Sequence, residues 1–277
     1  MLFSYDISTD RFLLKSAGAK SSTPHNLDKY EYFRYVPEDE AAKERIRNFL
    51  VNDPQEICFE ITNKCNLSCP ICIANAGEKN TIFLQLSFID KTLKTLSKHF
   101  QRVTITGGET TLHPNITDIL SLSTERYGTV LSTNGYYPEQ IDYISKNYKN
   151  LIIAISLHGP REIHDSFVGK AGAFDNALKS IKLSVKNGAF THVYTTASKQ
   201  NINYFKQLSD LISGLGVIEH RINLVKPKGR QGTGSVSWEE VYDIINSRDY
   251  PHRIAIKREE QPFLFVSCHG EMEIKNV

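Results

Sequence analysis

The sequence predicts an α/β fold, and two observations indicate a partial barrel within that class. From about residue 57 onward, short apolar runs alternate with amphipathic segments, which indicates a parallel sheet with right-handed crossovers. Several of these runs alternate apolar with small or polar residues, as where Ile153 and Ile155 flank Ala154. Because an open two-sided sheet has two apolar faces, one polar face indicates a curved sheet whose inner wall lines a cavity. We therefore predict a TIM-like partial (βα)6 barrel with its site at the C-terminal ends of the strands.

The barrel is expected to occupy most of the chain. Six strands are expected at residues 57–62, 102–106, 129–133, 151–157, 192–196 and 221–225. Helices are expected between them near residues 87–99, 115–126, 138–148, 174–187 and 201–214. These elements define a core domain at residues 51–235, with an N-terminal extension at 1–50 and a short C-terminal extension at 236–277.

The two extensions have weaker patterns than the core. The first is polar and charged, with a strand signal at 11–14 and an expected helix at 38–51. It is either a strand and a helix packed on the core or a fragment of a peptide-recruiting module. The second begins with an expected helix carrying Trp238 on its apolar face, followed by short apolar runs at 253–256 and 263–266.

The composition is that of an ordinary globular protein. The chain has 277 residues, of which 40% are apolar and 23% are charged, and its net charge is +2. That charge predicts neither general nucleic-acid binding nor membrane binding. We expect a cytoplasmic protein, because there is no apolar run of membrane length, no signal-peptide pattern and an odd number of cysteines, five, that suits a reducing compartment.

Three cysteines lie within eight residues directly after the first strand: Cys65, Cys69 and Cys72. Thiolates at this spacing suit zinc or an iron-sulfur cluster. A structural zinc site needs four protein ligands, and neither Cys58, inside the strand, nor His99, far along a helix, is an obvious fourth. A cubane cluster held by three cysteines instead leaves one iron open for a small molecule.

The pattern Cys-x3-Cys-x2-Cys, with Ile71 before the last cysteine, resembles the signature of the radical S-adenosylmethionine (radical SAM) enzymes. The resemblance implies that Cys65, Cys69 and Cys72 bind a 4Fe-4S cluster whose open iron takes S-adenosylmethionine. It also implies an electron donor such as flavodoxin or ferredoxin, and reductive cleavage to a 5'-deoxyadenosyl radical that abstracts hydrogen from a substrate. Ile71 would lie against the adenine.

A second motif, Gly107-Gly108-Glu109, follows the second expected strand. Glycines let the backbone approach a ligand closely, and a carboxylate can accept hydrogen bonds from an ammonium group, although a plain βα turn would look similar. After the cysteine motif it resembles the family's Gly-Gly-Glu segment, which implies that Glu109 binds the methionine amino group. The family usually has proline at the next position, where this chain has Thr110.

Two further strand ends carry polar residues. Ser132 and Asn134, in Ser-Thr-Asn-Gly, take the positions that bind the ribose in the resemblance. Ser156, in Ser-Leu-His-Gly-Pro, is similar to a stretch of the molybdopterin-precursor cyclase and peptide-maturase (SPASM-like) branch, and is the candidate for the methionine carboxylate. His158 replaces the usual aspartate there, and a lone histidine is at least as often structural as catalytic.

The family likeness covers about residues 55–235. His164 lies in a segment read as a loop, where it is expected to have a structural role. The segment Pro227-Lys228-Gly229-Arg230 resembles a Pro-x-Gly-Arg segment of peptide-modifying members, although a basic glycine-rich loop could instead be merely solvated. Several motifs in order at successive strand ends predict an enzyme more strongly than any single one.

The substrate prediction rests on Cys268, in Val-Ser-Cys-His-Gly near the end of the sequence. It is either a buried, idle thiol or the first ligand of the cysteine-rich domain in which peptide maturases bind auxiliary clusters. One thiol cannot hold a second cluster, so we expect one cluster per chain, a shortened form of that domain and a ribosomally made peptide as substrate. The alternatives are a small molecule or nucleotide and, less favoured, a non-catalytic iron-sulfur or zinc protein.

Overall fold

The computed structural model describes residues 2–6, 11–15, 56–96, 101–225, 229–230, 234–237, 239–241, 253–256, 263–269 and 272–275. A hairpin of β1 (Leu2–Asp6) and β2 (Arg11–Lys15) confirms the strand expected at 11–14. The helix expected at 38–51 lies outside the described residues. Of the helix expected after residue 235, only residues 239–241 are described, and they are helical.

One nine-stranded sheet forms the centre of the domain, in the order β11-β10-β3-β4-β5-β6-β7-β8-β9. All neighbouring strands are parallel except β10 and β11. The strands are β3 (Glu56–Glu60), β4 (Arg102–Thr106), β5 (Gly128–Thr133), β6 (Leu151–Ser156), β7 (Phe190–Ala197), β8 (Glu219–Leu224), β9 (Arg253–Ile256), β10 (Phe263–Val266) and β11 (Met272–Lys275). The six predicted barrel strands are thus β3 to β8, and the two apolar runs near the end of the chain are β9 and β10.

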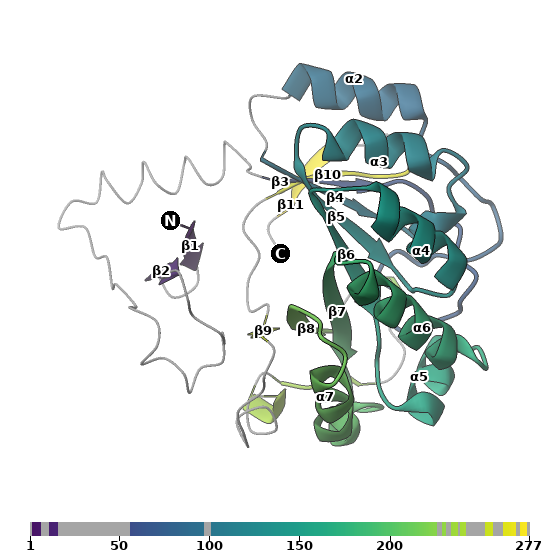
Figure 1. Cartoon of the computed structure of the whole chain (residues 1–277), viewed down its shortest axis with the longest axis vertical. Coiled ribbons are helices and arrows are strands. Elements are labelled where there is room, and N and C mark those ends of the chain that lie inside the picture. Colours follow the sequence, from purple (N-terminus) through teal and green to yellow (C-terminus); the bar gives the residue numbers. More distant parts are fainter. Residues whose placement is uncertain are drawn as a thin grey trace.

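Helices connect the parallel strands and lie along one face of the sheet (Figure 1). They are α2 (Leu86–Leu96), η2 (Thr110–Leu112), α3 (Ile116–Thr124), α4 (Pro138–Asn147), α5 (Arg161–Val168), α6 (Ala173–Lys186), η3 (Ile202–Tyr204) and α7 (Phe205–Ser213). This alternation confirms the α/β class and the partial barrel.

The segment read as a loop around His164 is instead the helix α5, so that expectation was wrong. The helix follows Pro160, carries Glu162 in its first turn and ends at Gly169, whose left-handed φ of +69° closes it. A glycine beyond the last turn and an acidic residue in the first are ordinary helix boundaries. His164 is buried on the inner side of this helix.

The two faces of the sheet differ as the sequence predicted. On the helix-covered face, strand residues such as Phe59, Ile105 and Ile153 are fully buried and pack with helical residues such as Ile141 and Ile181. The alternate residues face the other way. Toward the C-terminal ends of the strands, that open face carries small or polar side chains: Thr106, Ser132, Ala154, Ser156, Tyr194, Thr196, Arg221 and Asn223. Nearer the other ends it also carries Cys58, Thr104, Val130 and Ile152.

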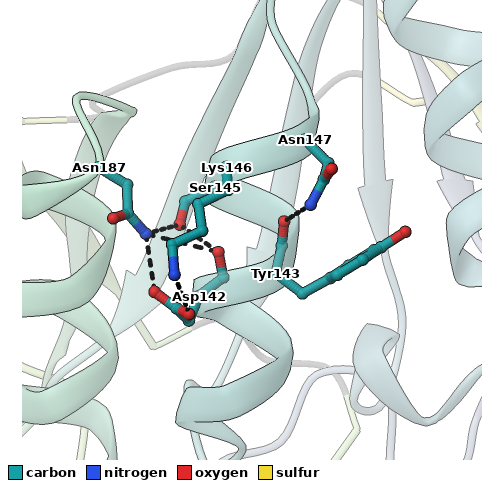
Figure 2. Close-up of polar contacts among 6 residues, drawn as sticks. All are labelled: Asp142, Tyr143, Ser145, Lys146, Asn147 and Asn187. Atoms are coloured by element: carbon teal, nitrogen blue, oxygen red, sulfur yellow. Dashed lines mark hydrogen bonds and ion pairs between the residues drawn. The ribbon is translucent and has the colours of Figure 1, made fainter.

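Polar contacts at the C-terminal end of α6 fix its position against α4 (Figure 2). Asn187 Nδ2 donates to Asp142 Oδ1 at 2.9 Å and to Ser145 Oγ at 2.8 Å. Asp142 also pairs with Lys146 at 2.5 Å on the same helix. The start of the loop between α6 and β7 is therefore tied to α4.

Candidate functional site

The cysteine loop leaves the C-terminal end of β3 and continues to α2. Two isolated bridges, Thr62 with Phe83 and Lys64 with Gly77, bring its two arms together. The Cys65 amide donates to Gly77 O at 2.9 Å across the same arms. The loop is thus closed at its base, and the three cysteines lie beyond this closure.

Backbone contacts fasten the loop to the end of β4. The amides of Gly108 and Glu109 donate to Thr62 O and Lys64 O, each at 2.7 Å. A Cβ atom at Gly108 would lie only 2.1 Å from Lys64 O, and one at Gly107 2.4 Å from Thr62 O. The close approach that these glycines permit is therefore to the cysteine loop, while their contact with a cofactor stays a prediction.

The loop is also held from the end of α5. The Ser68 amide donates to Val168 O at 3.1 Å, and a Cβ at Gly169 would lie 2.4 Å from Ser68 Oγ. Lys170 Nζ donates to Asn66 O at 3.3 Å. Below these contacts lies a small apolar cluster of Leu67, Phe167, Val168 and Ala173, against which Cys65, Cys69, Ile71 and Tyr136 pack.

The three thiols are half-buried and close enough to influence one another. Burial, with a smaller contribution from nearby negative charges that include Cys72, raises the pKa of Cys65 to about 11 and that of Cys69 to about 12. Cys65 and Cys69 are therefore neutral thiols at pH 7, and they become thiolates only with a positive partner such as a metal. Across the described part of the chain, no three His, Cys, Asp or Glu side chains form a group that could hold a single metal ion.

The sulfurs of the cysteine loop have hydrogen-bond donors of their own. Ala76 N donates to Cys72 Sγ at 3.4 Å, and Asn134 Nδ2 donates to Cys65 Sγ at 3.9 Å. Donors of this kind stabilise thiolate ligands of a metal. Three cysteines with such donors are residues that fit an iron-sulfur cluster in which one iron is left open.

Glu109 is fully buried beside the loop and accepts four hydrogen bonds. Its Oε1 accepts from Thr111 N at 3.1 Å, Thr111 Oγ1 at 2.6 Å and Thr133 Oγ1 at 2.6 Å, and its Oε2 accepts from Asn134 N at 2.7 Å. No Lys, Arg or His in the described ranges pairs with it, and burial raises its pKa. A buried carboxylate held only by neutral donors suits a ligand with a positive charge.

The other predicted cofactor residues lie at the same edge of the sheet. Ser132 and Ser156 are half-buried on the open face of β5 and β6, and Ile71 packs with the cysteines. The Asn134 side chain is already occupied, because its Oδ1 accepts from Tyr136 N and its Nδ2 donates to Asn66 Oδ1, both at 2.9 Å. Asn134 thus connects β5 to the cysteine loop.

Several residues at the site were not predicted from the sequence. Thr111 and Thr133 hold Glu109, and Thr110, at the position where proline is usual, donates through Oγ1 to Ser132 O at 2.8 Å. A hydroxyl one or two residues after Gly-Gly-Glu is a usable sign of such a network. Asn66 and Lys170 could be found only from the fold.

The two histidines near β6 have structural partners. His158 Nδ1 accepts from Thr196 N at 3.2 Å, and the ring stacks on Phe167 with centroids 4.3 Å apart. His164 Nδ1 accepts from His158 N at 3.0 Å. Burial lowers the pKa of both, that of His164 to about 4, so both rings are neutral at pH 7.

Cys268 is buried just after β10, which pairs with β3. Burial, with a smaller contribution from the charge of Glu60, raises its pKa to about 11. Its relation to a cysteine-rich domain stays a prediction.

The family model of the radical SAM superfamily matches residues 59–212 of the chain. The chain belongs to the radical SAM superfamily. Radical SAM proteins are enzymes that use a 4Fe-4S cluster and S-adenosylmethionine, which agrees with the cysteines and the buried carboxylate described above. No helix in the described ranges is long and apolar enough to cross a membrane.

Two relatives differ in the activities named for them. The antilisterial bacteriocin subtilosin biosynthesis protein AlbA of Bacillus subtilis is 29% identical over 182 residues, 64% of this chain and 41% of AlbA. The AdoMet-dependent heme synthase of Methanosarcina barkeri is 30% identical over 196 residues, 65% of this chain and 53% of that enzyme. The chain spans about half the length of the curated relatives it matches.

Among solved structures, Streptococcus suis SuiB bound to its precursor peptide SuiA has a similar fold. The TM-score is 0.69 at 16% identity, over 84% of this chain and 62% of SuiB. At this identity the likeness supports the fold alone, a radical SAM partial barrel.

The contact between Gly108 and the cysteine loop gives a direct test. We expect Gly108→Ala to displace the loop, because the new Cβ would meet Lys64 O at 2.1 Å. A clash with backbone costs about 1–3 kcal/mol. The free energy of unfolding of the metal-free chain, measured by chemical denaturation, should fall below the wild-type value. The iron content after anaerobic reconstitution should also be lower than that of the wild type.

Gly77→Ala is the control, since Gly77 lies on the cysteine loop itself and a Cβ there has nothing within 4 Å. It should retain wild-type stability and iron content. Equal behaviour of the two variants would show that the close approach at Gly108 does not hold the loop.

Proposed function

We propose that this radical SAM enzyme binds one 4Fe-4S cluster through Cys65, Cys69 and Cys72 and acts on a ribosomally synthesised peptide. The observation that carries the cofactor assignment is the buried Glu109, held by neutral donors beside the cysteine loop. When bound, the cluster supplies the electron that cleaves S-adenosylmethionine. An external donor such as a flavodoxin or ferredoxin supplies that electron in turn.

The residues of the chain bind and orient the cofactor. One acceptor position of Glu109 Oε2 is left for the methionine ammonium, because this oxygen accepts only from Asn134 N. Ser156 takes the methionine carboxylate, and Ile71 and the cluster of apolar residues around it exclude water from the adenine side. Ser132 takes the ribose, and Asn134 joins it when the bond to Asn66 opens.

A peptide is favoured by the relatives and by the chemistry of the open face. AlbA is named for bacteriocin biosynthesis, and SuiB binds a precursor peptide. On β7 and β8 the open face carries Tyr194, Thr196 and Asn223. Arg221 completes this wall, and its charge is compensated by Glu219 at 2.8 Å. Such a wall of donors and acceptors suits peptide amides.

A small molecule is the second candidate. The heme synthase relative, 30% identical, supports it. A tetrapyrrole presents a broad apolar ring, which the polar side chains of β7 and β8 match less well than they match a peptide backbone.

The first prediction concerns the cysteines. After anaerobic reconstitution, the wild-type chain should bind about four irons, the content of one cubane cluster, and form 5'-deoxyadenosine with a reductant. The variant with Cys65, Cys69 and Cys72 replaced by alanine should do neither. Iron analysis, electron paramagnetic resonance and chromatography of the products measure this, and a wild-type chain that takes up one zinc and no iron would refute the assignment.

The second prediction separates the carboxylate from the cluster. Glu109→Gln should retain the iron, because Glu109 is not an iron ligand, and should bind S-adenosylmethionine at least about tenfold more weakly through loss of one charge-assisted hydrogen bond. Equilibrium dialysis of the reconstituted protein measures the affinity. Glu139→Gln, on the exposed start of α4, is the control. Unchanged binding by Glu109→Gln would contradict the role.

The third prediction concerns the substrate. The candidate substrate is a peptide encoded beside the gene for this chain, prepared in deuterated form. During the reaction 5'-deoxyadenosine should gain deuterium from this peptide, and the peptide should lose mass or form a new crosslink. A porphyrin and a nucleoside triphosphate serve as parallel substrates. Mass spectrometry of both products gives the answer, and deuterium gained only from one of the small molecules would exclude the peptide.

A further inference from the structure

The loop after β8 reaches back across the molecule to the cysteine loop. Gly229 and Arg230 lie there, about 160 residues away in sequence from the cysteines they contact. The sequence left open whether this basic, glycine-containing segment was merely solvated. Arg230 is half-buried and makes three hydrogen bonds to the cysteine loop, so it is not merely a solvent-exposed residue.

The bonds of Arg230 are distributed along the second half of the loop. Its backbone amide donates to Cys72 O at 2.9 Å, its Nε donates to Cys69 O at 2.8 Å, and a terminal guanidinium nitrogen donates to Ala76 O at 2.7 Å. A weaker contact of 3.5 Å joins the same nitrogen to Asn75 Oδ1. One residue thus bonds the carbonyls of two cluster cysteines and of the residue that ends the turn after them.

Gly229 permits this approach. A Cβ at this position would lie 2.1 Å from Cys72 O and 2.5 Å from Ile73 O, and its φ of +69° is left-handed. Only glycine satisfies both conditions without displacing the loop. The glycine and the arginine therefore form one device, in which the first brings the backbone close and the second binds it.

We propose that Arg230 is a positioning residue for the cluster: it fixes residues 69–76 in the geometry that the cluster requires and places a permanent positive charge beside Cys69. The proposal rests on the proposed function, in which Cys69 and Cys72 are cluster ligands. It adds a residue outside the cysteine and Gly-Gly-Glu motifs to the machinery of the site.

Two consequences follow from the chemistry of the guanidinium group. Its planar fork can serve Cys69 O and Ala76 O together, which a lysine ammonium on a flexible stem cannot do. Its charge persists at any working pH and favours the more negative, reduced state of a nearby cluster, so it raises the reduction potential. Geometry and charge can therefore be separated by substitution.

The geometric part is tested first in the full chain without metal. We expect Arg230→Met and Arg230→Lys to speed amide hydrogen exchange in residues 72–77 at least about tenfold, the effect of losing one hydrogen bond to a charged group. Gly229→Ala should do the same by displacement. Gly188→Ala is its matched control, because φ there is +74° and a Cβ would have nothing within 4 Å.

The charge is tested in the reconstituted protein. Redox titration followed by electron paramagnetic resonance should give a more negative potential for Arg230→Met and a nearly wild-type potential for Arg230→Lys. Iron loss to a chelator should be faster in both variants, because both release residues 69–76. These readouts do not depend on turnover of a substrate.

The outcomes distinguish this proposal from the proposed function. Wild-type exchange in Arg230→Met would overturn the geometric role, and an unchanged potential in that variant would overturn the charge role. If the wild-type chain takes up no iron, the proposed function fails, and the charge role fails with it. The exchange measurement on the metal-free chain still decides whether Arg230 holds the loop.

Discussion

Close packing of backbone against backbone holds the cysteine loop where the strands end. Gly108 from the end of β4 and Gly229 from the loop after β8 each approach a backbone carbonyl of the loop so closely that a single methyl group would collide with it, and the Ser68 amide of the loop donates to Val168 O at the end of α5. Bonds within the loop, such as Cys65 N to Gly77 O and Asn75 N to Cys72 O, close its base and one of its turns. Three other parts of the chain fix this loop against the ends of the strands, and they thereby help to position the thiols.

Glu109 joins the first of these parts, the end of β4, to the end of β5 by hydrogen bonds. It follows Gly108 directly, and its carboxylate binds Thr133 and the Asn134 amide at the end of β5. Asn134 in turn bonds Asn66 on the cysteine loop. These hydrogen bonds connect Glu109 through Asn134 to the cysteine loop. An ammonium group bound at Glu109 would strengthen this network, because it would place a positive charge beside a buried carboxylate that has only neutral donors.

The sequence was informative where local pattern and tertiary structure agree. Alternation of apolar and polar residues places β4 at 102–106, and a short apolar run places β10 at 263–266, both with the bounds expected. The cysteine spacing and Gly-Gly-Glu indicated the site because their chemistry is carried by short segments. The helix α5 was missed because a histidine and flanking glycines resemble a loop, and its apolar face becomes visible only against Leu67.

Contacts between distant segments account for the rest. Nothing near Arg230 in sequence indicates that its partners are carbonyls of the cysteine loop, since these contacts exist only when β8 closes toward β3. The hydroxyls of Thr111 and Thr133 likewise become a cage only when β4 and β5 are paired. Gly107 is a similar case. A glycine in the sequence indicates that the backbone comes close to another group, but it does not identify that group, which in the structure is Thr62 O of the cysteine loop.

The short chain segment between β9 and β10 limits how flat the sheet can be. These strands are consecutive in the chain, yet β9 pairs with β8 and β10 pairs with β3, so that seven strand spacings separate them. In a flat sheet that separation would be about 34 Å at about 4.8 Å per strand. The chain from Ile256 to Phe263 can span at most about 25 Å. The link between β9 and β10 is thus too short for a flat sheet. The sheet must curve until β9 and β10 lie within about 25 Å of each other.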